Sequence, residues 1–323
     1  MLDYRLLGSC RVRKECKQSR DFTERAIIAA NNDELPKSEW LEGSKGGICE
    51  GEDAPNCLPK FAKLREMTRI YYTTKAKIGV CSVRKSMSRV MKSLTCLLND
   101  PLGFLLSGRD LITDASSEGC KAEREISNMT KCEQNGWTAA NGWQYVMVVR
   151  DPVDRFLSGW LHMCVVGAVG HCEHNCFGCG PNMTCFLERT RKQLDEMAAT
   201  GGYVSGVAKH MMPQNWFCQL HTYEKNYTFL HYDEDSGRFF RRELDPLLRE
   251  QGVSDDLREY VQRRMIAGTT PHATKSFKLR SFLKERLLSS SYLLDRLVRL
   301  FYADYSTFGL DLPQLKSPNR KEA

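Results

Sequence analysis

Two arginines and a serine follow an apolar run in the middle of the chain, at a spacing that could bind an anion. Residues 145–149 are unbroken apolar and rich in β-branched side chains, as in a strand buried on both faces. Asp151 and Pro152 then suit the N-cap and first position of a helix. Arg150 is therefore expected at the carboxyl end of a strand and beside a helix N-terminus, where anions are favoured. Ser158, two turns into the helix, could add a hydroxyl.

The arginines of this segment have a simpler alternative use. Arg150 and Arg155 could pair with Asp151 and Asp154, because charged loop residues are mostly solvated. The position of the segment directly after a strand favours the anion site, since structural context is what gives a short motif its meaning.

A second junction of the same kind lies earlier, with Lys85 placed 65 positions before Arg150. Residues 77–83 form a strand candidate, and the apolar residues of 87–98 recur at helical spacing. Strand, short polar turn and helix is the plan of a P-loop, although the Gly-x-x-x-x-Gly-Lys-Ser/Thr sequence is absent. Free amides at the helix start could bind a phosphate that Lys85 neutralises. An exposed basic turn with Ser86 as N-cap is the alternative.

Taken together, the two junctions resemble the donor-binding segments of sulfotransferases that use 3′-phosphoadenosine 5′-phosphosulfate (PAPS). The resemblance is to the Golgi carbohydrate branch, and within it to nematode members of the chondroitin type. It implies that Lys85 contacts the sulfuryl group and stabilises charge on the leaving phosphate, while Arg150 and Ser158 hold the 3′-phosphate. Arg155 matches the motif and could equally brace the loop. The donor-binding set implied in this way is Arg84, Lys85, Ser86, Met87, Ser88, Arg150, Arg155, Ser158 and Lys275.

A histidine is the best candidate for the base that such a transfer needs. His210 opens a His-x-x-Pro-Gln sequence with Cys218 nearby, which resembles an acceptor-side segment of the same family. Histidine suits proton removal from an acceptor hydroxyl because its pKa lies near neutrality. A loop or core histidine without this role is the alternative, and an Asp or Glu base is also open. The rival histidines are His162, His171, His221, His231 and His272.

Cysteines and glycosylation sequons point to an oxidising compartment. The chain has 14 cysteines, and Asn128, Asn182 and Asn226 each begin an Asn-x-Ser/Thr sequon. Together they favour the secretory lumen, and the resemblance implies the Golgi, with secretion as the alternative. Neither a signal peptide nor a membrane anchor is visible in this sequence, so a cytosolic protein is the simpler alternative.

The cysteine pattern also suggests particular bridges. Cys49 and Cys57 flank a Gly- and Pro-rich loop and could be joined. The cluster at 164–185 has irregular spacing and contains a sequon, which favours disulfides over a zinc site.

The predicted architecture is a three-layer α/β domain like that of P-loop proteins, with a short central parallel sheet. It is expected to span 71–312, with the Cys-rich insert at 164–185, after a polar region at 1–70 and before a charged tail at 313–323. A further strand is predicted at 227–232. Helices are predicted at 61–72, 186–199, 239–250, 255–267, 277–288 and 292–302. The run at 302–310 resembles the end of the same family, and its aromatics are expected to pack in the core.

Three functions are compatible with these features. The first is transfer of a sulfuryl group from PAPS to a hydroxyl of a chondroitin-like glycosaminoglycan or other glycan, with no metal required. The second is a P-loop-type nucleotide kinase, and the third is an inactive glycan-binding protein on the same scaffold. The formal net charge of +7 favours an anionic partner, but no block of Lys and Arg is long enough to indicate nucleic acid.

Overall fold

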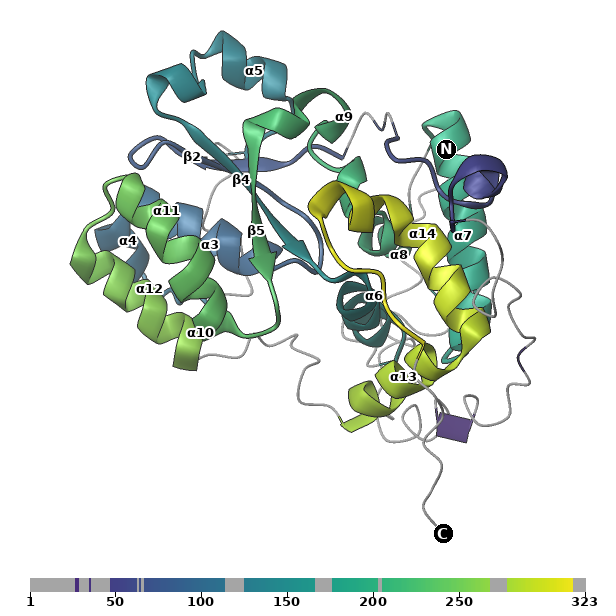
Figure 1. Ribbon diagram of the computed structural model, residues 1–323. Coiled ribbons are helices and arrows are strands. Elements are labelled where there is room, and N and C mark those ends of the chain that lie inside the picture. The colour runs from purple at the N-terminus through teal and green to yellow at the C-terminus, as the bar shows by residue number, and fades with distance from the viewer. Residues whose placement is uncertain are drawn as a thin grey trace, which may run out of the picture.

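A five-stranded mixed sheet forms the centre of the protein (Figure 1). The computed structural model describes residues 27–28, 35, 47–62, 64, 67–113, 125–165, 176–202, 205–267 and 278–315. The strand order is β3-β1-β2-β4-β5, and β2, β4 and β5 are parallel while β1 pairs antiparallel with both of its neighbours. The strands are β1 (Ile70–Thr73), β2 (Ile78–Cys81), β3 (Glu125–Ile126), β4 (Gln144–Arg150) and β5 (Tyr227–Tyr232).

Helices cover both faces of this sheet, which confirms the predicted three-layer α/β class. On one face lie α3 (Ser88–Asn99), α4 (Pro101–Leu106), α10 (Ser236–Phe239), α11 (Asp245–Glu250) and α12 (Asp255–Ala267). On the other lie α6 (Pro152–Trp160), α7 (Met183–Thr200), α8 (Gly206–Met211), α13 (Lys278–Ser289) and α14 (Ser291–Phe308). Two short helices, α5 (Met129–Gln134) and α9 (Leu220–Tyr223), lie at the far end of the sheet.

The central strand β4 shows why its sequence is continuously apolar. Its side chains alternate between the two cores: Met147 and Val149 pack with α6 and α14, whereas Val146 and Val148 pack with α3 and α11. Because both faces are buried, neither set can be polar.

The predicted short parallel sheet is confirmed as the core of β2, β4 and β5, and the antiparallel strands β1 and β3 extend it on one side. One prediction about this side of the sheet was wrong. The predicted helix at 61–72 is absent from the described residues of that range, and Ile70–Thr73 instead forms β1 beside β2. The β-branched and aromatic residues of β1 suit a half-buried strand, and pairing with β2 satisfies their backbone groups.

The C-terminal helices mostly agree with the sequence pattern. Helix α7 ends at Gly201, whose φ of 63° is the left-handed conformation that favours glycine in a C-cap. Helix α14 is longer than predicted and continues to Phe308, with Gly309 as its C-cap at the same φ. Tyr305 and Phe308 are buried in the core, as expected for the aromatics of this run.

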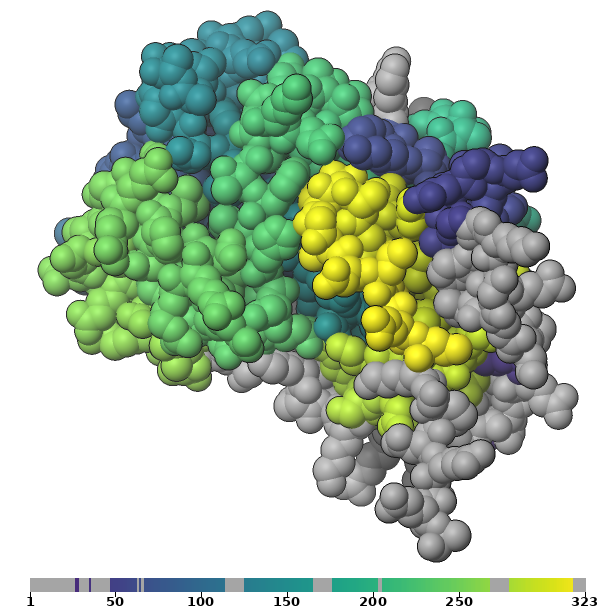
Figure 2. All heavy atoms as spheres, in the orientation of Figure 1, coloured from purple at the N-terminus to yellow at the C-terminus, as the bar shows by residue number. Residues whose placement is uncertain are grey.

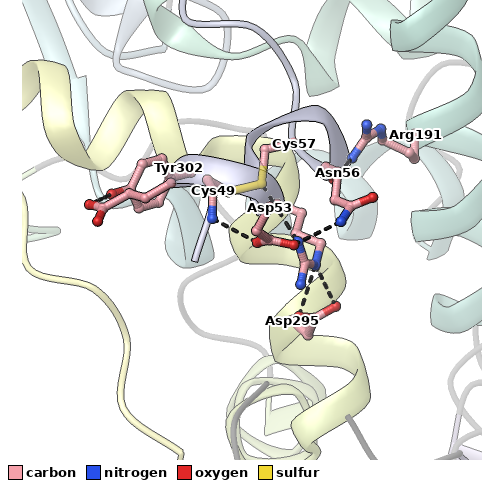
Figure 3. The surroundings of a disulfide bond; sticks show 9 residues. Cys49, Asp53, Asn56, Cys57, Arg191, Asp295 and Tyr302 are labelled. Carbon is pink, nitrogen blue, oxygen red and sulfur yellow. Dashed lines mark hydrogen bonds and ion pairs between the residues drawn. A yellow bond between two sulfur atoms is a disulfide. The ribbon is translucent and has the colours of Figure 1, made fainter. Parts of the chain in front are cut away.

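The loop from Cys49 to Cys57 is held against α14 by an ion pair (Figure 3). The predicted Cys49–Cys57 disulfide is present and closes a loop around a 3-10 turn. Asp53 within this loop accepts from the Arg299 guanidinium at 2.7 and 2.8 Å. Figure 2 shows these residues (dark purple) lying against α14 (yellow). The two thiols and the carboxylate lie close enough to bind a metal, but the disulfide and the ion pair already use them.

The cysteines that the structure describes in the Cys-rich insert form disulfides and not a zinc site. Cys164 is bonded to Cys176, and Cys179 to Cys185, so these four cysteines are unavailable to zinc. Cys172 and His171 lie outside the described residues. Several disulfides of this kind are typical of proteins of the secretory pathway. No helix in the described part of the chain is long and apolar enough to cross a bilayer.

Candidate active site at the carboxyl ends of β2 and β4

The loop between β2 and α3 takes an unusual backbone path. Lys85 and Met87 have φ values of 68° and 54°, in the left-handed region that costs non-glycine residues about 1 kcal/mol each. Met87, not Ser86, is the N-cap of α3, and it supplies no side-chain cap. The first amides of α3, beginning at Ser88, therefore have no capping side chain and can bind an anion. Strain of this kind in a loop is common at functional sites.

Arg150 brings the second junction to the first. It ends β4, is 8% exposed, and donates from its guanidinium to the Lys85 carbonyl at 2.8 Å. The same guanidinium pairs with Glu234 and lies 5.6 Å from the centre of the Tyr232 ring. Its Nε is buried without a hydrogen-bond partner among the described residues. The two predicted anion sites thus lie side by side at the carboxyl ends of the parallel strands β2 and β4.

The helix after Arg150 begins as the sequence indicates. The Asp151 carboxylate caps α6 by accepting from the Asp154 amide at 3.0 Å. Asp154 then accepts from Arg280 at 2.8 Å and from Lys284 at 2.7 Å. Although burial opposes it, the hydrogen bond from Lys284 and the nearby cations hold the pKa of Asp154 below its usual range. Neither aspartate pairs with Arg150, contrary to the simpler alternative.

Arg155 is placed differently from Arg150. It is 1% exposed, and its guanidinium donates to the backbone carbonyls of His210, at 3.2 Å, and Met212. It also lies 5.5 Å from the Phe301 ring centre. Burial lowers its pKa to about 10. These contacts describe a brace for the segment after α8, which is the second role that the sequence left open.

Of the three serines in the donor set, Ser86 and Ser158 are buried and Ser88 is half-buried. Ser86 is 2% exposed, and its hydroxyl donates to the Gln214 side chain at 2.9 Å. Ser158 is 8% exposed and lies in α6, all of whose residues are buried. The Ser86 hydroxyl is thus already used within the protein, and its junction can offer a ligand backbone amides, cations and the Ser88 hydroxyl.

His210 adjoins the first junction. The Arg84 guanidinium lies 3.2 Å from its Nε2, and because a guanidinium only donates, Nε2 accepts and the neutral ring carries its proton on Nδ1. Burial, followed by the charges of Lys85 and Arg84, lowers the pKa of His210 to about 2. The ring of the rival His162 lies 6.4 Å away, whereas His221 and His231 are exposed on α9 and β5. His272 and Lys275 lie outside the described residues.

Lys85 is a cation whose charged form is destabilised by its surroundings in the site. Burial, followed by repulsion from Arg150 and Arg89, lowers its pKa from 10.5 to about 7. Burial and Arg69 likewise lower the pKa of Arg84. No carboxylate pairs with Lys85 in the described part of the chain. This cluster of positive charge is what an anionic ligand would neutralise.

Three residues that the sequence analysis missed belong to this site. Gln214 lies within the His-x-x-Pro-Gln sequence, but its type gives no sign of its contacts. Glu234 pairs with Arg150 and with Arg280, the latter at 2.9 Å. Glu234 could have been found, since it lies just beyond Asp233 at the carboxyl end of β5, and the carboxyl ends of neighbouring parallel strands lie together. Nothing in the sequence around Arg280 indicated its position.

Comparison with known proteins agrees with this geometry. A model described as "Sulfotransferase family" matches residues 68–311. Three proteins of Caenorhabditis elegans are similar: "Uncharacterized protein C18B2.2", 29% identical over 89% of this chain and 80% of its own length; "Putative sulfotransferase vep-2", 28% over 84% of both; and "Carbohydrate sulfotransferase chst-1", 25% over 75% of both. No solved structure matches. Since the family model covers most of the chain and ends beyond both junctions, this protein belongs to the sulfotransferase family.

Proposed function

We propose that this protein transfers a sulfuryl group from PAPS to a hydroxyl of a chondroitin-like glycosaminoglycan or related glycan. The observation that carries the proposal is the contact between the two junctions, in which the Arg150 guanidinium donates to the Lys85 carbonyl at 2.8 Å. Arg150, Arg89 and Arg84 all lie near enough to the Lys85 ammonium to lower its pKa, after the larger effect of burial. A nucleotide with phosphates at both ends fits two neighbouring cationic junctions. PAPS, when bound, supplies the sulfuryl group and leaves as 3′-phosphoadenosine 5′-phosphate (PAP).

The residues of the first junction would act mainly by position and charge, as in phosphoryl transfer. Lys85 would neutralise charge that develops on the leaving phosphate, and the uncapped amides of α3 would donate to its oxygens. Arg150, with its unpartnered Nε, and Ser158 would hold the 3′-phosphate at the second junction. Arg84, Met87 and Ser88 would complete the donor loop.

His210 would remove the proton from the acceptor hydroxyl. With a pKa near 2 it is too weak a base in the free protein. The charges of Lys85 and Arg84 are two of the causes, so an anion bound between them would raise the pKa of His210 toward its usual range. The site would then become basic only when the donor is in place.

The acceptor class and the compartment rest on further support. One relative is named a carbohydrate sulfotransferase, which favours a glycan acceptor. The disulfides favour a secretory compartment, and we place the protein in the Golgi lumen, associated with the membrane, with secretion as the alternative. A nucleotide kinase is disfavoured by the lack of a Walker sequence, and no specific contact supports an inactive glycan-binding protein.

The test is transfer of radiolabelled sulfate from PAPS to desulfated chondroitin, together with thermal shift. PAP is expected to raise the melting temperature where ADP with Mg²⁺ does not. Lys85→Ala should reduce transfer by about 100-fold or more, and His210→Ala by about 100-fold to 10,000-fold. Lys225→Ala, an exposed lysine at the opposite end of β5, should leave transfer unchanged. Stabilisation by ADP–Mg²⁺ alone would support a kinase, and glycan binding without transfer would support the inactive alternative.

A further inference from the structure

The side chain of Gln214 hydrogen-bonds to the backbone of β4 beyond the point where β2 stops pairing with it. Strand β2 pairs with β4 only as far as Met147, opposite Cys81, and then turns away into the donor loop. Three residues further along β4, Gln214 takes the place of the missing strand at Arg150. Its Oε1 accepts from the Arg150 amide at 3.1 Å, and its Nε2 donates to the Arg150 carbonyl at 2.8 Å. The backbone of Arg150 is thereby fixed from the side that faces the donor loop.

The same amide also holds the first junction. Gln214 Oε1 accepts a second hydrogen bond, from the Ser86 hydroxyl at 2.9 Å. The Gln214 side chain is 0% exposed, so these bonds form away from water. A carboxamide oxygen has two acceptor positions, and here one is used by each junction. One side chain therefore links the loop that carries Lys85 to the strand end that carries Arg150.

Gln214 is itself held from outside the sheet. Its backbone amide donates to Asp304 at 2.8 Å, and the Asn215 amide and side chain donate to the same carboxylate at 2.9 and 2.6 Å. Asp304 is 0% exposed on α14. Arg155 fixes the carbonyl of Met212 just before it. The link between the junctions is thus anchored to α14 and α6.

We propose that Gln214 is a positioning residue that sets the separation of the two anion-binding junctions, so that a ligand charged at both ends is bound by both at once. The inference rests on the proposed function, which makes that ligand a nucleotide with 3′- and 5′-phosphates. When two sites are held at a matching distance, binding at the second becomes intramolecular, and affinity exceeds that of either end alone. Loss of the link should therefore lower the affinity for ligands with two charged ends more than the affinity for ligands with one.

The test compares three nucleotides by calorimetry on the whole protein: PAP, which has both phosphates, and adenosine 5′-monophosphate and adenosine 3′-monophosphate, which have one each. Gln214→Leu should lower the affinity for PAP by about 10-fold to 100-fold and the affinity for each monophosphate by only a few-fold. Asn99→Leu is the matched control. Asn99 is a buried amide that donates to the carbonyls of Tyr72 and Thr95, both at 2.9 Å, at the far end of α3. This variant should lose stability without a change in the ratio of PAP to monophosphate affinity.

A second variant keeps the test valid if Gln214→Leu does not fold. Gln214→Glu has nearly the same shape, but when ionised it cannot donate to the Arg150 carbonyl, and when protonated it can. Burial raises the pKa of a carboxyl group. Compared with wild-type protein at the same pH, which corrects for the titration of Lys85, the ratio of PAP to monophosphate affinity should therefore recover toward the wild-type ratio as the pH falls from 8 to 6. A residue that only supported the fold would not give this recovery.

Each outcome has a distinct meaning. If wild-type protein binds PAP more tightly than both monophosphates and the Gln214 variants lower all three affinities equally, or none, Gln214 does not couple the junctions and the inference fails alone. If wild-type protein binds PAP no better than the monophosphates, the proposed function fails and the inference with it.

Discussion

The affinity for PAP should fall as the pH rises above 7, because Lys85 loses its proton in the free protein. Its pKa there is about 7, since the ammonium is buried beside Arg150 and Arg89. A bound phosphate reverses the sign of the local charge and restores the pKa toward its usual 10.5. Above pH 7 the free form is mostly neutral and the bound form charged. Binding therefore takes up a proton, and raising the pH opposes it.

The size of this effect follows from the pKa of the free site. With that pKa near 7, the charged fraction of Lys85 falls between pH 7.5 and 9.0 by about 20-fold, and the PAP affinity should fall by the same factor. Close to one proton should be taken up per PAP bound at pH 8.5. The second pKa of a phosphate, near 6, lies below this window, so the ligand itself contributes little.

Calorimetry in buffers of different ionisation enthalpy measures both the affinity and the proton uptake. Lys85→Arg keeps a charge that does not titrate in this range, so both the pH slope and the proton uptake should disappear. Lys225→Arg, at an exposed site beyond the other end of β5, should retain them. A wild-type affinity that is constant from pH 7.5 to 9.0, or a slope that persists in Lys85→Arg, would show that Lys85 does not charge on binding.

Two further predictions concern the surroundings of the site. Glu234→Gln removes a carboxylate that competes with a phosphate for two arginines, so PAP should bind about fivefold more tightly, and a weaker affinity in calorimetry would show that Glu234 positions those arginines instead. Replacing both cysteines of the Cys81–Cys218 disulfide by serine opens a loop of 137 positions, and chain entropy predicts a stability loss of about 5 kcal/mol, against about 2.5 kcal/mol for Cys49–Cys57 with a separation of 8. Urea unfolding measures both losses, and equal or reversed values would contradict the loop-length argument.

The junction at the end of β4 could be predicted because its signals are local. An apolar run, a capping carboxylate at Asp151 and a proline at the first helical position lie within a few residues, and each has one structural meaning. The structure reproduces all three, including the bond from the Asp154 amide to Asp151. The carboxyl ends of β2 and β4 could also be placed together from topology alone, since neighbouring parallel strands end at one edge.

The edge of the sheet could not be predicted in the same way. Strand β1 has four residues, too few for a two-residue alternation to be distinguished from the end of a helix. Its direction depends on pairing with β2 and with β3, which is only two residues long. Pairing with β2 is a local hairpin across a short connection, whereas pairing with β3 is decided by long-range contacts that leave no periodic trace in either segment.

Ser86 shows what a motif leaves open. The resemblance places Ser86 in the donor-binding set, and in the structure its hydroxyl donates to Gln214, 128 positions later in the chain. The motif fixes the type of residue, whereas the partner is chosen by a segment that the motif does not include. A serine can therefore be required at this position for the shape of the loop, through its hydrogen bond to Gln214.

The arrangement of charges explains why the site should respond to its ligand as a unit. Lys85, Arg84 and Arg150 are brought close together by the backbone of two strands and by Gln214, with Glu234 as the nearby carboxylate. Burial, and then repulsion from Arg150 and Arg84 among others, lowers the pKa of Lys85 in the free protein, and burial together with Lys85 and Arg84 lowers that of His210. An anion bound among these cations relieves repulsion on every one of them, so it would charge Lys85 and make His210 more basic in the same event. Donor binding and activation of the base are then consequences of one electrostatic change, and a variant that uncouples the junctions should weaken both.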